Sequence, residues 1–330
     1  MTTTTSAKSD TTLARYRHRL PQLDADRLFL TDGGLETTLI FHEGWELPNF
    51  ESYVLLDSDR GRAAIRAYFD RYVPLAVAAG AGFVLECPTW RANPSWGPRN
   101  GYDPDRLAKA NRDAVSMMQA IRAVYETPTT PMPISGNLGP RGDGYEAGRI
   151  MSIAEAGAYH AWQVGIFATT AADFVSAFTI TNVNEAIGFT RAAQAASIPA
   201  VVSFTVETDG RLPTGDALGD AIEAVDSATA ASPAYYMINC AHPTHFADTL
   251  RPGGAWTSRI RGLRANASYR SHAALDNATE LDFGDPVELG RQHRELLSRH
   301  PGLVVLGGCC GTDHRHVGEI VRSCSLGKAA

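Results

Sequence analysis

The chain has 330 residues, of which 44% are hydrophobic and 20% are charged, and its formal net charge is −6 at pH 7. This composition supports a large buried core, and the lack of a Lys- or Arg-rich block argues against nucleic acid and anionic membranes as partners. No apolar run has the length of a signal peptide or a bilayer span, so we expect a cytoplasmic protein. Five cysteines are too few, and odd in number, for a disulfide scaffold.

Residues 1–24 are polar and predict a flexible N-terminal lead-in, which precedes one domain over residues 25–330. From there short apolar runs alternate with segments whose apolar residues recur at helical spacings of three and four. The predicted strands are Leu28–Leu30, Gly82–Leu85, Met132–Ser135, Phe174–Phe178, Ala200–Phe204, Tyr235–Ile238, Gly262–Ala265 and Leu303–Leu306. The predicted helices are Ala63–Ala79, Pro104–Tyr125, Ile153–Thr170, Glu185–Ala196 and Val287–His300.

Short apolar strands that alternate with helices are typical of a parallel sheet. Eight such units fit a closed (β/α)8 barrel, whose active site lies at the carboxyl ends of the strands. The alternative is an open doubly wound sheet, which would be expected to carry a G-x-G-x-x-G turn after an early strand. The first turn, residues 32–36, reads DGGLE and lacks that spacing. The sequence therefore predicts a single-domain (β/α)8 TIM barrel of the α/β class.

Three cysteines stand where predicted strands end. Cys240 follows the sixth strand, and Cys309 and Cys310 follow the eighth strand after two glycines. Adjacent cysteines can bond to each other only with strain, so the pair suits a soft metal ion better. The two strands are two apart around the predicted barrel, which lets all three thiolates reach one ion. Thiolates favour Zn²⁺, and three of them leave the fourth tetrahedral position open, so we predict a catalytic zinc site.

Three thiolates make zinc electron-rich, which suits a substrate thiol better than the splitting of water. Binding deprotonates such a thiol, and its sulfur can then attack an electrophilic carbon, so the predicted reaction is alkyl transfer to a thiol. A structural site that mixes cysteine with histidine and a redox pair at the adjacent cysteines are weaker alternatives, because no C-x-x-C spacing is present. The histidines concerned are His242, His245, His314 and His316. Cys87 is read as a small buried residue, and Cys324 is given no role.

Segment 307–312, which reads GGCCGT, resembles the homocysteine S-methyltransferases, as do Asn239-Cys240 and the Asp32-Gly33-Gly34 turn. The resemblance extends from about Phe29 to about His316. It implies a (β/α)8 barrel in which Cys240, Cys309 and Cys310 hold zinc and the homocysteine sulfur is the fourth ligand, so that methyl transfer gives methionine.

The same resemblance implies which residues bind substrate. Asp32, Gly33 and Gly34 would lie against the amino-acid end of the acceptor. Segments 89–93 and 135–140 match further family segments at the barrel mouth and contribute Thr89 and Asn137. Asn266, after the seventh strand, lies in the same predicted layer.

The chain departs from the family at Phe178, where a glutamate usually grips the ammonium group of the acceptor. Either Asp32 suffices, or Glu86 or Glu207 compensates, or the acceptor is a thiol other than homocysteine. Arg91 also replaces a common neutral glutamine, which indicates a carboxylate in the substrate or donor.

The methyl donor is weakly encoded. The chain lacks the long C-terminal extension of betaine-dependent relatives and any cobalamin or folate module, so we expect a small onium donor, S-methylmethionine or S-adenosylmethionine. The aromatic residues near the mouth could bind an onium group or simply pack on the barrel rim. They are Trp45, Trp90, Trp96 and Tyr102.

Two alternatives stay open. One is the same zinc chemistry on a different thiol, or with a betaine-like or sulfonium donor, and the other is a non-catalytic zinc- or thiol-binding protein. The outer helices could support a homo-oligomer.

Overall fold

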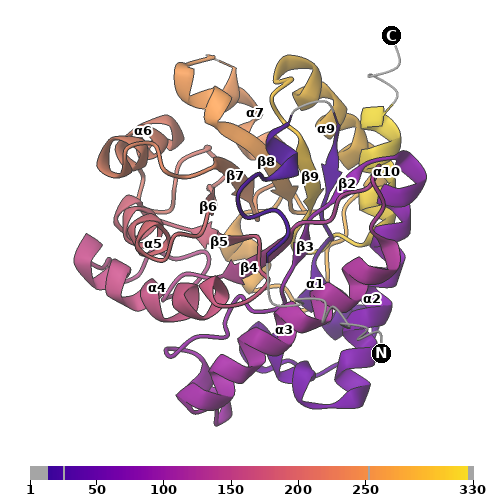
Figure 1. Ribbon diagram of the computed structural model, residues 1–330. Helices are drawn as coiled ribbons and strands as arrows, with labels where there is room; N and C mark the ends of the chain where they lie inside the picture. Colours follow the sequence, from indigo (N-terminus) through magenta and orange to yellow (C-terminus); the bar gives the residue numbers. More distant parts are fainter. Residues whose placement is uncertain (1–13, 25–26, 252, 326–330) are drawn as a thin grey trace, which may run out of the picture.

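A computed structural model of the chain describes residues 14–24, 27–251 and 253–325. Its strands are all parallel and lie in the order β2-β1-β9-β8-β7-β6-β5-β4-β3 around a barrel (Figure 1). They are β1 (Phe29–Leu30), β2 (Gly82–Phe83), β3 (Leu85–Glu86), β4 (Ile134–Leu138), β5 (Phe174–Ile180), β6 (Ala200–Phe204), β7 (Tyr235–Asn239), β8 (Ile260–Ala265) and β9 (Val305–Gly308).

The barrel closes because β2 and β3 are two pieces of one strand. They are separated only by Val84, and they stand at the two ends of the strand order. β2 pairs with β1, whereas β3 pairs with β4. Counting the split strand once leaves eight, so the predicted (β/α)8 barrel of one domain is confirmed.

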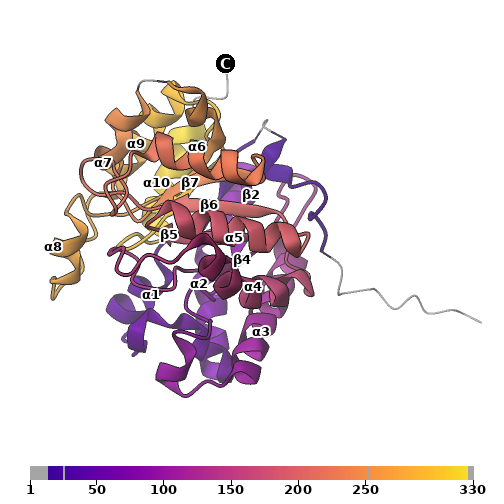
Figure 2. The same ribbon diagram turned by 90° about the vertical axis from the view of Figure 1, so that its left-hand side faces the viewer.

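The helices surround the strands (Figures 1 and 2). Several begin where the sequence supplies a side-chain cap: Ser58 before α2, Asp103 before α3, and Ser152 with Glu155 in a capping box before α4. In the described part of the chain no helix is long and apolar enough to cross a bilayer. The helices are α1 (Leu35–Thr37), α2 (Asp59–Ala79), α3 (Pro104–Tyr125), α4 (Ile153–Ala168), α5 (Val183–Ala195), α6 (Leu218–Thr229), α7 (Pro243–Leu250), α8 (His272–Asp276), α9 (Pro286–Arg299) and α10 (His314–Ser325).

Strand side chains are buried on both faces, as expected when helices cover a parallel sheet. One apolar cluster packs between strands and helices, and a smaller one includes Phe29, Phe174, Val201 and Val305. Leu20, before β1, and Phe178, near the end of β5, belong to the smaller cluster as well. The core therefore reaches from before the first strand to the carboxyl-terminal end of β5.

Several predicted bounds differ from those in the structure. The third strand, predicted over Met132–Ser135, runs over Ile134–Leu138 and takes in Gly136, where a side chain would collide with the Phe167 ring. Cys324, which was given no role, is buried in α10, which packs on α9. The last strand, predicted over Leu303–Leu306, runs over Val305–Gly308, so Cys309 follows it directly.

The predicted flexible lead-in is structured where it is described. Residues 1–13 lie outside the described residues. The backbone N–H of Tyr16 donates to Asp173 (2.6 Å), Leu20 is buried, and Gln22 donates to the Tyr235 hydroxyl (3.3 Å). Residues 14–24 pack against the barrel because their few apolar and amide side chains find partners there.

Candidate metal centre

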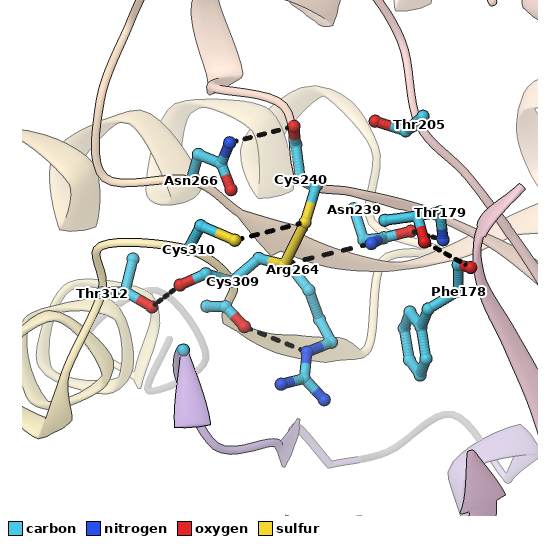
Figure 3. Close-up of a disulfide and its surroundings, with 12 residues drawn as sticks. Phe178, Thr179, Thr205, Asn239, Cys240, Arg264, Asn266, Cys309, Cys310 and Thr312 are labelled. Carbon is cyan, nitrogen blue, oxygen red and sulfur yellow. Dashed lines mark hydrogen bonds between the residues drawn. A yellow bond between two sulfur atoms is a disulfide. The ribbon is translucent and has the colours of Figure 1, made fainter. Parts of the chain in front are cut away.

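The three predicted ligands meet at the mouth of the barrel. Cys240 follows β7, Cys309 and Cys310 follow β9, and β8 lies between these two strands. The three Sγ atoms lie within 4.8 Å of one another, and Cys240 Sγ is 3.9 Å from Cys310 Sγ (Figure 3). The strand spacing expected from the sequence therefore brings the thiols together.

Two of the three sulfurs are bonded to each other in the structure. Cys240 and Cys309 form a disulfide, and their Cα atoms are 5.4 Å apart, while Cys310 is free. The sequence predicted three separate thiolates. The same convergence that would suit a soft cation brings two of the thiols within bonding reach of each other.

The backbone at these cysteines is shaped for close approach. Cys240 has a φ of 53°, and its carbonyl accepts hydrogen bonds from Asn266 Nδ2 (3.0 Å) and His272 Nε2 (2.7 Å). A side chain at Gly308 would collide with Thr312, and one at Gly307 would collide with Thr31. The glycines before the cysteine pair are thus required by packing.

Two further side chains touch the sulfurs. The Tyr145 hydroxyl donates to Cys310 Sγ (3.5 Å), and Asn239 Nδ2 lies 4.0 Å from Cys309 Sγ. The Tyr145 ring stacks on His272 with the ring centroids 4.0 Å apart. Sequence reasoning missed Tyr145, because it lies in a long loop after β4 whose residues show no periodic pattern.

The sulfurs line a cavity of about 460 Å³. The predicted substrate-binding residues Asp32, Gly33, Gly34, Asn137 and Phe178 line the same cavity. Two other predicted substrate-binding residues, Thr89 and Asn266, do not line the cavity. Thr89 is buried and donates to the Asn137 carbonyl (2.7 Å), and Asn266 donates to the Cys240 carbonyl. These two side chains hold the strand ends in place.

An ion pair that the sequence analysis missed lies deep in the cavity. Arg264 Nη2 is 2.9 Å from Asp32 Oδ1, and the Tyr68 hydroxyl donates to Asp32 Oδ2 (3.1 Å). Burial raises the pKa of Asp32, and the nearby guanidinium opposes that shift. The available signal was an arginine among the apolar residues of the predicted strand Gly262–Ala265.

The departure at position 178 is part of this arrangement. The Phe178 ring centroid lies 5.2 Å from Arg264 Cζ. Glu86, named as a compensating acid, lines the cavity, and burial raises its pKa to about 7. Glu207, the other, pairs with His272 (3.1 Å) and is not part of the cavity lining.

Arginine guanidinium groups already stack over the aromatic residues that were considered for the onium donor. Arg60 lies over Trp45, and Arg106 lies over Tyr102. Arg91 lies 4.5 Å from the Trp90 centroid and 3.7 Å from the Trp96 centroid, and Arg99 lies 3.9 Å from Trp96. This arrangement favours rim packing over an open aromatic face for a cation.

The histidines do not join the cysteines. Among the described residues, only Cys240, Cys309 and Cys310 form a group that could hold a metal ion. His245 Nε2 instead donates to the Tyr269 carbonyl (2.8 Å) and His316 Nε2 to the Phe283 carbonyl (2.8 Å). The mixed cysteine–histidine site therefore has no support in the structure.

Comparison with known proteins gives one family and one fold. The model of the homocysteine S-methyltransferase family matches residues 29–324. No curated protein gave a match. The metallated form of the homocysteine methyltransferase MmuM from Escherichia coli is 19% identical, with a TM-score of 0.74 over 92% of this chain and 98% of that one. Its oxidized form, also 19% identical, has a TM-score of 0.72 over 90% and 96%. These structures share the fold.

Proposed function

Because the chain belongs to the homocysteine S-methyltransferase family and is a thiol methyltransferase, we propose that it moves a methyl group from a small onium donor to a thiol held at a zinc ion. Cys240, Cys309 and Cys310 would hold the zinc. S-methylmethionine and S-adenosylmethionine are the proposed donors. Homocysteine, the acceptor in the family's name, is the first acceptor to test and would give methionine.

The observation that carries this proposal is the convergence of three sulfurs on one cavity. The Sγ atoms lie within 4.8 Å of one another, and thiolates are the ligands that zinc prefers among soft donors. When bound, zinc would lower the pKa of an acceptor thiol and leave one coordination position for its sulfur. The disulfide between Cys240 and Cys309 must be reduced first, because a bonded pair offers no thiolates.

The residues around the sulfurs have separable tasks. The Tyr145 hydroxyl donates to Cys310 and spreads charge away from that sulfur, and the Asn239 amide stands beside Cys309. In the transfer itself, an electron pair of the acceptor sulfur forms the new bond to the methyl carbon. The bond from that carbon to the onium centre breaks, and its electron pair stays on the donor, which leaves as a neutral thioether or amine. The thiol proton goes to solvent.

A second candidate keeps this chemistry but changes the acceptor or uses a betaine-like donor. The observation that favours a different acceptor is the pairing of Asp32 with Arg264 next to Phe178, because it neutralises the acid that the family resemblance assigns to the amino-acid end of the acceptor.

The test is a turnover panel with reduced, zinc-loaded protein, in which thiols and methyl donors are crossed and products are identified by mass spectrometry. We expect methylated thiol and demethylated donor in equal amounts, and loss of both when a chelator removes the zinc. Undiminished methyl transfer by protein shown to be free of metal would contradict the proposal.

A further inference from the structure

The guanidinium of Arg264 is fixed within the cavity that holds the sulfurs. Its Nε donates to the Gly308 carbonyl (3.0 Å), and its Nη2 donates to the Gly33 carbonyl (3.0 Å). The carbonyl of Arg264 in turn accepts from the backbone N–H of Cys240 (3.1 Å). A cation is therefore anchored to the residue before Cys309 and to the strand beside Cys240 (Figure 3).

This cation balances the carboxylate nearest to it. Asp32 is 3% exposed, and one of its oxygens faces Arg264 while the other accepts from Tyr68. An ammonium group brought to Asp32 would lie beside a guanidinium, and like charges in a buried site repel strongly. Asp32 is thus poorly placed to recognise an amine.

The other buried acids do not replace it. Burial raises the pKa of Glu86 to about 7, and burial also raises the pKa of Glu36, which accepts from the Ser52 hydroxyl. Phe178 contributes an aromatic ring on the remaining side of the guanidinium. Arg264 is the cation that lies among these three acids. Asp143 and Asp276 also line the cavity, and Asp143 pairs with Arg91 (3.7 Å).

One guanidinium nitrogen is left for a ligand. In the described part of the chain, no residue accepts a hydrogen bond from Arg264 Nη1. We propose that the acceptor is a short thiol with an anionic terminus and no α-ammonium group, that is, a mercaptocarboxylate or mercaptosulfonate. Its anion pairs with Arg264. Such a pair joins opposite charges through a charge-assisted hydrogen bond. This inference rests on the proposed function.

Three thiols of matched length separate the two groups: homocysteine, 4-mercaptobutanoate, which lacks the amino group, and 3-aminopropane-1-thiol, which lacks the carboxylate. Binding to reduced, zinc-loaded protein is measured by calorimetry, and sulfur in the zinc shell is counted by X-ray absorption. We expect 4-mercaptobutanoate to bind at least as tightly as homocysteine and 3-aminopropane-1-thiol to bind at least tenfold more weakly. Homocysteine tighter than 4-mercaptobutanoate by tenfold or more overturns the inference.

Variants assign the effect to residues. Arg264→Gln should bring the three affinities within about threefold of one another, and Asp32→Asn with Arg264→Gln does the same without leaving a lone buried charge. Phe178→Glu should shift preference towards homocysteine. If Glu86→Gln weakens homocysteine tenfold and spares 4-mercaptobutanoate, Glu86 holds an ammonium group and the inference is wrong. If zinc is present and no thiol enters its shell, the proposed function itself fails.

Discussion

Asp173 at the amino-terminal end of the barrel and two asparagines at its mouth differ in how their polar atoms are paired. At the amino-terminal end of β5, Asp173 accepts from the N–H groups of Tyr16 and Ile134 and from Arg122 Nη1, at distances of 2.6 to 3.0 Å. At the mouth, Asn137 Oδ1 and Asn266 Oδ1 are buried and have no hydrogen-bond partner among the described residues. Nearby, Cys240 and Thr179 hold positive φ angles.

This contrast separates stability from function within one fold. Buried polar groups are normally paired, and an unpaired one such as Asn137 Oδ1, which belongs to a residue of the cavity lining, is available to a ligand or water. Loops at the carboxyl ends of barrel strands carry the chemistry, whereas the opposite face serves folding. Changes at the mouth should therefore alter metal binding and substrate binding. Changes at the floor, the amino-terminal end of the barrel, should alter the free energy of unfolding.

The largest expected effect is at the sulfurs. Cys309→Ala or Cys310→Ala should remove most of the zinc and lower turnover by about 100-fold or more, while the melting temperature shifts by only a few degrees, since the lost groups serve a site rather than the core. Zinc is measured by mass spectrometry on purified protein. Cys87→Ala is the control, because Cys87 is buried and lines the cavity but lies outside the metal-binding group. Full zinc in both variants would refute the ligand assignment.

At the floor of the barrel, substitutions should lower the stability and leave turnover unchanged. Asp173→Asn leaves Arg122 buried without its charge partner, so the free energy of unfolding in urea should fall by roughly 3–5 kcal/mol. Turnover per folded molecule should be unchanged. Asp113→Asn breaks an exposed pair with Lys109 and should cost less than about 1 kcal/mol. Equal losses of unfolding free energy in the two variants would show that the buried pair at the floor stabilises the protein no more than the exposed pair does.

Tyr145→Phe tests the mouth without removing a sulfur. The variant loses the hydroxyl that donates to Cys310. The sulfurs then hold more charge, the pKa of a bound acceptor thiol rises, and kcat/KM at pH 7 should fall about tenfold, as expected for one hydrogen bond to a charged group. Zinc content should stay the same. Tyr269→Phe, at a side chain that is 71% exposed, is the control. An unchanged pH profile would leave Tyr145 without this role.

The smallest expected effect concerns pH. Because burial raises the pKa of Glu86 to about 7, the folded protein binds its proton more tightly than the unfolded chain does. The free energy of unfolding should therefore fall as the pH rises from about 4.5 to about 7. Glu86→Gln removes this contribution, so the free energy of unfolding of the variant should rise relative to that of the native protein as the pH rises from about 4.5 to about 7. A constant difference between the two unfolding curves would show that Glu86 does not titrate there.

The sequence predicted those features that depend on local pattern. Strand β6 and helix α3 have the predicted bounds, because a short apolar run and apolar spacings of three and four can be recognised from neighbouring residues alone. The convergence of Cys240 with Cys309 followed from counting strands. Arg264 and Asp32 are 232 positions apart, and their pairing depends on a register between β8 and the turn after β1 that no local pattern encodes. Which two of three close sulfurs bond is likewise a matter of packing.

The placement of the sulfurs on β7 and β9 has a mechanical consequence. The Cys240–Cys309 bond closes a loop with a sequence separation of 69, which contains β8, α7, α8 and α9. Fully extended chain spans about 3.5 Å per residue, so this loop withholds roughly 240 Å of contour length from a force applied at the two termini. A single molecule pulled in an optical trap would lengthen by that amount only after a reductant has opened the loop.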